Sequence, residues 1–110
     1  MPRRVRDLDT FTRSVGEQIR WLEGHRPLDD ASRFRDAIEA FIRRIAASPG
    51  IGHELERVEA RSLRVFALGA GLPYRVWYRY SPDDRDGEVK LLLLLHDSQD
   101  RERFDPTQHE

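Results

Sequence analysis

Apolar residues in the first half of the chain recur with the period of an α-helix. Phe11, Val15, Ile19 and Leu22 share one helical face, and this spacing predicts a helix over residues 12–23. Polar residues occupy the opposite face of this segment. The helix is therefore expected to pack one side against a core and to expose the other.

A second and longer apolar stripe predicts a helix that ends at Ala47. Asp29 or Asp30 is the expected N-cap, and a Ser-Pro-Gly run at 48–50 stops the helix because proline cannot continue it. Charged residues on the opposite face pair at i, i+4 spacing, which is typical of a solvated surface. The stripe consists of Ala31, Phe34, Ala37, Ile38, Phe41, Ile42 and Ile45.

After Gly52 the pattern changes to the two-residue alternation of β-strands. Strands are predicted over residues 61–68, 74–80 and 88–95, separated by a glycine-rich turn and by a polar loop that ends in Asp-Gly. The last of them is apolar on both faces, which is typical of a central strand. Residues 3–8 predict an edge strand at most.

Together these elements predict one α+β domain over residues 1–110. Two N-terminal helices pack on one face of a small, mainly antiparallel sheet of three or four strands, in the order βααβββ, because this arrangement buries both apolar stripes. The second face of the sheet then carries arginine, tryptophan and histidine side chains, which can bind nucleic acid or a partner peptide. Residues 97–110 are acidic and are expected to form a partly disordered tail.

Composition narrows the class of protein. The chain has 110 residues, 35% of them charged, and no cysteine, so disulfide frameworks and cysteine-based zinc sites are excluded. The four histidines are scattered, and neither a metal nor a cofactor is expected. The longest apolar run is Leu91–Leu95, and no apolar stretch follows the basic start, so neither a membrane span nor a signal peptide is expected. We predict a cytoplasmic protein.

Charge is unevenly distributed along the chain. The formal net charge is −1, from 19 basic and 20 acidic residues. Residues 81–110 hold four of the basic and nine of the acidic residues, so the body is mildly basic and the end is acidic. Every basic residue but Lys90 is arginine, which binds carboxylates and phosphates in two-point fashion, although an arginine-rich genome explains the same bias.

Five short motifs carry a resemblance to a known family. Their order and spacing resemble the RelE/ParE superfamily of type II toxin–antitoxin toxins, also called plasmid stabilisation proteins, over about residues 5–104. The motifs are Phe11-Thr-Arg-Ser-Val15, Pro49-Gly-Ile-Gly52, Arg61-Ser-Leu-Arg64, Tyr74-Arg-Val-Trp-Tyr-Arg79, and Leu91–Leu95 followed by His96.

The resemblance implies one of two activities, and a cognate antitoxin that wraps the toxin in a hetero-oligomer. ParE-like members poison DNA gyrase by binding it. RelE-like members are ribosome-dependent endoribonucleases that cut mRNA without a metal. A third alternative is a non-toxic interaction domain that kept the fold. Whether the chain is an enzyme is open at this point.

The ribonuclease alternative assigns three catalytic roles by position in the family's motifs. Glu54 is the general base, Arg75 the phosphate clamp, and His96 the general acid, whose ordinary pKa of ~6.5 suits that work. Each residue also has an ordinary structural explanation. These are an exposed turn acid, an arginine paired with a cross-strand acid such as Glu88, and a half-buried histidine at a strand end.

Four further residues are candidates for contact with the target or the antitoxin. Trp77 and Arg79 lie on the aromatic strand, where Trp77 can stack on a base or on a partner; packing into a core is its common alternative role. Arg61 and Arg64 precede them on the neighbouring strand and can contact an antitoxin carboxylate or solvent.

The charge balance favours the ParE-like alternative. Affinity for RNA rises with each phosphate that a protein neutralises, and a chain with one lysine and a net charge of −1 suits a protein target better. The segment after His96 also lacks the Arg or Tyr of many RelE-like relatives. We therefore expect a toxin that binds a protein such as DNA gyrase. If residues 97–110 lie over the open sheet face, their deletion should increase affinity for a polyanion.

Overall fold

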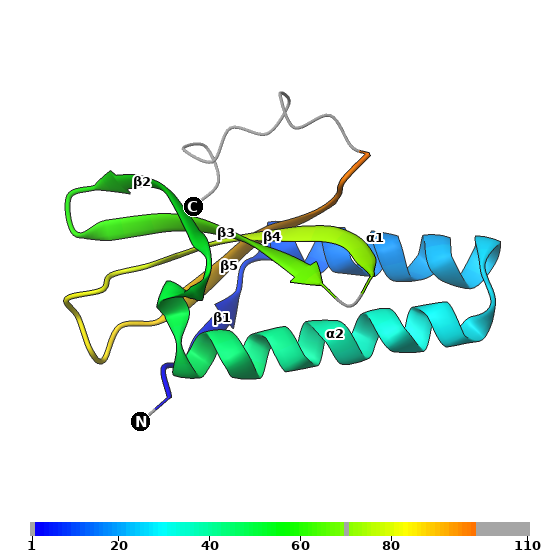
Figure 1. Ribbon diagram of the computed structural model, residues 1–110, viewed down its shortest axis with the longest axis horizontal. Helices are drawn as coiled ribbons and strands as arrows, with labels where there is room; N and C mark the ends of the chain where they lie inside the picture. Colours follow the sequence, from blue (N-terminus) through cyan, green and yellow to red (C-terminus); the bar gives the residue numbers. More distant parts are fainter. Residues whose placement is uncertain (1, 70, 99–110) are drawn as a thin grey trace.

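A hairpin of two helices covers one face of a five-stranded sheet (Figure 1). This computed structural model describes residues 2–69 and 71–98, so residues 99–110 of the expected tail lie outside the described part of the chain. The helices are α1 (Asp9–His25) and α2 (Leu28–Ala47), and a 3-10 turn, η1 (Pro49–Ile51), follows α2. The strands are β1 (Val5–Asp7), β2 (His53–Val58), β3 (Arg61–Gly69), β4 (Leu72–Tyr80) and β5 (Val89–His96).

The strands lie in the order β1-β5-β4-β3-β2. β1 runs parallel to β5, and the other neighbours are antiparallel. The α+β class, the helices on one face and the edge position of the first strand are therefore confirmed. The expected sheet had three or four strands, and even the full βααβββ order has one strand fewer than the five observed, because β2 was missed. All but one of the residues of β2 are exposed, and a bulge between Glu54 and Glu56 interrupts its alternation.

Both helices bury the apolar stripes that predicted them. Phe34 and Ile45 of α2 are 0% exposed, and Phe11 and Leu22 are buried on α1. α1 begins at Asp9, ahead of the expected start, because the Thr12 N–H already donates to the Leu8 carbonyl, at 3.0 Å. The carboxylate of Asp9 then lies in the first turn, where the helix dipole favours negative charge.

Successive side chains of β4 point to opposite faces of the sheet and so contribute to two separate apolar clusters, one on each face. On the helix side, Tyr74, Val76, Tyr78 and Tyr80 join the side chains of both helices in the main core. The opposite face, called the open face below, carries a smaller cluster of buried side chains with partly buried neighbours. The buried members are Leu63, Trp77 and Leu92, and the neighbours are Leu8, Val65, Leu93 and Leu95.

The phenol of Tyr78 fastens the junction between α2 and β2 to the middle of the sheet. Its hydroxyl donates to the Pro49 carbonyl at 2.6 Å and accepts from the Gly52 N–H at 2.9 Å. Tyr78 is 0% exposed, and burial raises the pKa of its hydroxyl to about 12. A Cβ on Gly52 would overlap this hydroxyl and lie 2.9 Å from both the Tyr78 ring and the Val65 carbonyl. Only glycine therefore fits at position 52.

The N-terminal arm closes the other end of the sheet. The guanidinium of Arg3 donates to four carbonyls of the β4–β5 loop, at 2.7–3.3 Å, and its carbon lies 5.1 Å from the ring centroid of Tyr80. The backbone N–H of Arg3 donates to the Ala46 carbonyl at 2.8 Å. One residue thus joins the loop, the last turn of α2 and the start of β1. Among the described residues, no helix is long and apolar enough to cross a bilayer.

Replacing Gly52 by alanine should destabilise the fold strongly. The added methyl group would push the Tyr78 ring or the backbone of β3, so we expect the free energy of unfolding to fall by about 3 kcal/mol, and Tm by about 10 °C or more. Urea and thermal unfolding followed by circular dichroism measure both. Gly24→Ala is the matched control, since a Cβ there meets nothing within 4 Å in α1, and should stabilise by up to about 1 kcal/mol. Equal behaviour of the two variants would contradict the close fit at Gly52.

The buried phenol of Tyr78 should make stability fall at alkaline pH. Its pKa is raised in the folded chain from 10.0 to about 12, so the folded state holds the proton that the unfolded state releases. Stability from this group is complete below about pH 10 and is lost as the pH rises toward about 12. Unfolding by urea across this range should show a smaller decline in Tyr78→Phe than in the wild type. A decline of equal size in both would show that Tyr78 does not cause it.

Candidate functional site

The three residues of the ribonuclease alternative do not meet in this fold. Glu54 pairs with Arg64 across β2 and β3, and Arg64 pairs with Tyr78, so Glu54 lies on the helix side of the sheet. Arg75 pairs with Ala67 and lies on the open face. His96 pairs with Tyr74 at the other end of β4, four residues from Tyr78 and so about 13 Å along the strand. One phosphate cannot touch all three side chains.

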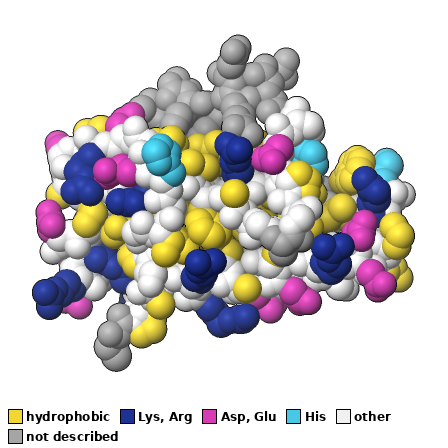
Figure 2. Space-filling view, viewed as in Figure 1, with side chains coloured by type: hydrophobic (Ala, Val, Ile, Leu, Met, Phe, Trp, Pro, Cys, Tyr) yellow, Lys and Arg dark blue, Asp and Glu magenta, His cyan; other side chains and the backbone are white. Residues whose placement is uncertain are grey.

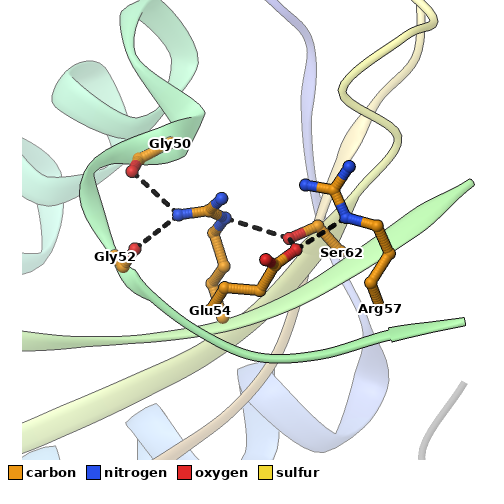
Figure 3. A network of polar contacts seen from close by, with 6 residues as sticks. Gly50, Gly52, Glu54, Arg57 and Ser62 are labelled. Atoms are coloured by element: carbon orange, nitrogen blue, oxygen red, sulfur yellow. Dashed lines mark hydrogen bonds and ion pairs between the residues drawn. The ribbon is translucent and has the colours of Figure 1, made fainter.

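Glu54 belongs to a polar network on the β2–β3 ribbon (Figure 3). Its Oε1 accepts from the Ser62 hydroxyl at 2.7 Å and from Nε of Arg57 at 2.8 Å. These two hydrogen bonds, that of Ser62 first, hold the pKa of Glu54 below its usual range. A carboxylate with a lowered pKa, already accepting two donors, is a poor general base. Its position favours a structural role.

Arg64 braces the turn that precedes β2. Its Nη1 donates to the carbonyls of Gly50 and Gly52, at 2.9 and 2.7 Å, and its Nε donates to Ser62 Oγ at 3.0 Å (Figure 3). The guanidinium carbon also lies 5.7 Å from the ring centroid of Tyr80. Arg64 therefore lies on the helix side of the sheet, beyond the end of α2, apart from the other three residues predicted to contact the target or the antitoxin.

The open face brings three of the predicted contact residues together. Trp77 is 6% exposed and packs in the small apolar cluster, so core packing, the alternative role considered for it, is the one found. Arg79 stands beside it, opposite Leu63 and Lys90, and Arg61 begins β3 at the exposed end of the same face. Aliphatic side chains at the centre and cations at the margin give this face the chemistry of a protein-binding surface.

Arg75 and His96 each have a local partner near the end of β5. Nε of Arg75 lies 3.4 Å from Asp97 Oδ1, whereas Glu88, the acid expected beside it, lies 3.8 Å from Arg6. Nδ1 of His96 accepts the backbone N–H of Ser98 at 3.0 Å. The edge of the His96 ring meets the Tyr74 ring, with centroids 5.1 Å apart. His96 thus lies on the helix side, opposite to the expectation that placed it on the open face.

Ser62 and Arg57 are the site residues that sequence reasoning missed. Ser62 is 0% exposed, and its hydroxyl links Glu54 to Arg64. The charged segment 53–58 was not assigned as a strand, and without β2 nothing placed the side chains of Glu54 and Arg57 near Ser62. In the part of the chain that the structure describes, no group of three His, Cys, Asp or Glu side chains is arranged to hold a metal ion.

Comparison with known proteins identifies one family. A family model described as the ParE toxin of the type II toxin-antitoxin system, parDE, matches residues 8–101. No curated protein matches the chain. The matched segment contains both helices, β2 to β5 and the whole of the open face described above.

The Glu54 network should make stability depend on acid pH. Because the pKa of Glu54 is lowered in the folded chain, its contribution is complete above the unfolded value of 4.5 and is lost as the pH falls through the folded value. We expect Glu54→Gln to be less stable than the wild type at neutral pH and to approach it as the pH falls below 4.5. Urea unfolding at a series of pH values measures this difference. A difference that stays constant with pH would contradict the network.

Proposed function

The chain belongs to the ParE toxin family of type II toxin–antitoxin systems, and we propose that it acts by binding a target protein, DNA gyrase, rather than by cutting RNA. A cognate antitoxin neutralises it by wrapping the toxin in a hetero-oligomer. The pair acts in the cytoplasm as a plasmid stabilisation module. The family supports the toxin and its antitoxin partner, and the geometry of the sheet and the charge balance support a protein target.

One observation carries the choice of a protein target. Glu54, Arg75 and His96 lie on different faces or at different ends of the sheet, so these three described side chains do not converge as general base, cation and general acid on one phosphodiester. The Arg75 guanidinium is also partly neutralised by Asp97, at 3.4 Å. Rearranging these strands would break the pairing of β4 with both neighbours.

The open face supplies a surface suited to a protein. Val65, Leu93 and Leu95 are partly buried there and surround the Trp77 cluster, with Arg61 at its exposed end. Mixed aliphatic and arginine surfaces are typical of protein interfaces, whereas affinity for RNA depends on many phosphate contacts. With 19 basic and 20 acidic residues in the chain, such contacts are opposed by a similar number of acids.

Two assays distinguish the proposed target from the ribosome. The purified chain should inhibit supercoiling by DNA gyrase and leave mRNA on translating ribosomes intact, and its expression without an antitoxin should slow growth. Cleavage of mRNA that His96→Ala abolishes would overturn the proposal in favour of the ribonuclease alternative. Unimpaired growth, with neither activity, would support a non-toxic interaction domain instead.

A charge reversal on the open face tests where gyrase binds. Arg61→Glu should raise the concentration of the chain needed for half-inhibition of supercoiling about tenfold. The substituted carboxylate would repel the acidic group of the target that the arginine is proposed to attract. Arg43→Glu makes the same change on the exposed face of α2 and serves as the control. Equal inhibition by both variants would exclude the Arg61 end of the face from the contact.

A further inference from the structure

A half-exposed tryptophan stands near the end of α1 in a fixed orientation. Trp21 is 48% exposed, and its ring stacks on that of His25 with centroids 4.6 Å apart and planes 8° from parallel. Nδ1 of His25 lies 2.9 Å from the Trp21 carbonyl, and because a carbonyl only accepts, this nitrogen carries a proton. The stack and the hydrogen bond hold both rings in place. The indole is therefore ordered before any partner arrives.

Trp21 and His96 form the walls of a surface hollow between α1 and the ends of β4 and β5. The hollow has two adjoining compartments that share these two side chains. One, of about 420 Å³, continues along Glu17 and Gln18 of α1. The other, of about 220 Å³, continues past Leu72 toward the turn between the helices. We call the two compartments together the Trp21 furrow.

The two compartments differ in chemistry. The larger one presents mainly apolar surface beside the indole, with one carboxylate, that of Glu17, on its wall. The smaller one is mainly polar, and two arginines, Arg26 and Arg33, line it against one acid, Asp30. Among the described residues, the Arg26 guanidinium makes no hydrogen bond or ion pair, and its charge acts on the buried phenol of Tyr74. The furrow therefore offers an apolar wall next to a cation.

Further apolar side chains are exposed at the end of the molecule where α1 leads into α2. In Figure 2 hydrophobic side chains lie beside histidine side chains at the right-hand end of the molecule, where α1 leads into the turn to α2. Leu28, the first residue of α2, is 73% exposed at the same turn. Exposed tryptophan and arginine side chains that are held in position are typical of the residues that dominate binding energy in protein interfaces.

We propose that the Trp21 furrow docks an acidic segment of a partner protein that presents an apolar side chain next to a carboxylate. The apolar side chain packs on the Trp21 indole in the larger compartment, and the carboxylate accepts from Arg26 in the smaller one. Within the smaller compartment two arginines face one acid, and this local charge favours a carboxylate there, since an arginine fork donates to a carboxylate with two N–H groups. The inference rests on the proposed function only in taking the ligand to be a protein.

The furrow is separate from the open face of the sheet. Trp21 belongs to a helix, and His96 pairs with Tyr74, whose side chain lies in the helix-side core. A partner segment in the furrow therefore leaves Arg61, at the far end of the sheet, uncovered. One long partner can cover both surfaces, and two partners can bind at once.

A peptide of defined chemistry tests the furrow directly. The probe is an acetylated, amidated ten-residue peptide with one phenylalanine flanked by aspartates in a serine-glycine background. Two-dimensional amide NMR of the full chain follows both indole N–H signals. The Trp21 signal should shift on titration and that of Trp77, on the open face, should not. A probe with asparagine for aspartate, and one with alanine for phenylalanine, should each shift it less.

Matched variants assign the contributions of the side chains. Trp21→Ala should weaken binding about tenfold or more, and Arg26→Gln about two- to fivefold. Arg43→Gln removes a charge from the exposed face of α2 and should change nothing. Thermal unfolding of each variant shows that the fold is kept. Unchanged affinity in Trp21→Ala, equal binding of the acidic and amide peptides, or a shift confined to Trp77 would each overturn the proposal.

The outcome is independent of the gyrase assay. If the probe binds at Trp21 and the wild-type chain does not inhibit supercoiling, the furrow stands and the proposed target fails. If supercoiling is inhibited and the probe does not shift Trp21, the target stands and the furrow fails.

Discussion

The hydroxyl of Tyr78 is the contact on which the arrangement of the other elements depends. It bonds the Pro49 carbonyl and the Gly52 N–H, and so fixes where the chain leaves α2 and enters β2. The same turn presents the Gly50 and Gly52 carbonyls to Arg64, and the position of β2 brings Glu54 to Ser62. These hydrogen bonds take the place of bonds to water for the backbone groups of the turn. A buried polar group left without a hydrogen bond would lower the free energy of unfolding. The absence of a side chain at Gly52 makes this close approach sterically permissible.

The two faces of the sheet are kept distinct by register. β4 alternates strictly, so its tyrosines meet the helices while Trp77 and Arg79 point to the open face. β5 is apolar on both faces and needs a bulge after Leu91 to keep in step with β4. This irregularity puts Leu92 and Leu93 together in the open-face cluster. The main core and the smaller apolar cluster of the open face are thus built from opposite sides of the same two strands.

Helices and strands with a strongly periodic pattern of apolar residues could be predicted from the sequence. The positions of side chains that depend on how strands pair with one another could not. The stripes of α1 and α2 and the alternation of β4 predicted both helices and the residues that meet them. β2 could not be found, because an exposed edge strand with a bulge has no alternation to detect. Whether Glu54, Arg75 and His96 lie close together depends on the pairing register of four strands, β2 to β5. A shift of one residue in any pairing moves a side chain to the opposite face of the sheet, so their positions could not be predicted. For the same reason the contacts of Arg64 with the Gly50 and Gly52 carbonyls were not predicted.

The first strand of the protein lies beside the last. β1 pairs with β5, and the Arg3 guanidinium is held by carbonyls of the loop that leads into β5. During synthesis the helices and β2 leave the ribosome long before β5, so the N-terminal arm has no strand to join and α1 lacks much of the surface it covers. Completion of the fold therefore waits for nearly the whole chain to be made. The open face, whose apolar cluster draws on β3, β4 and β5, is likewise complete only when nearly the whole chain has been made.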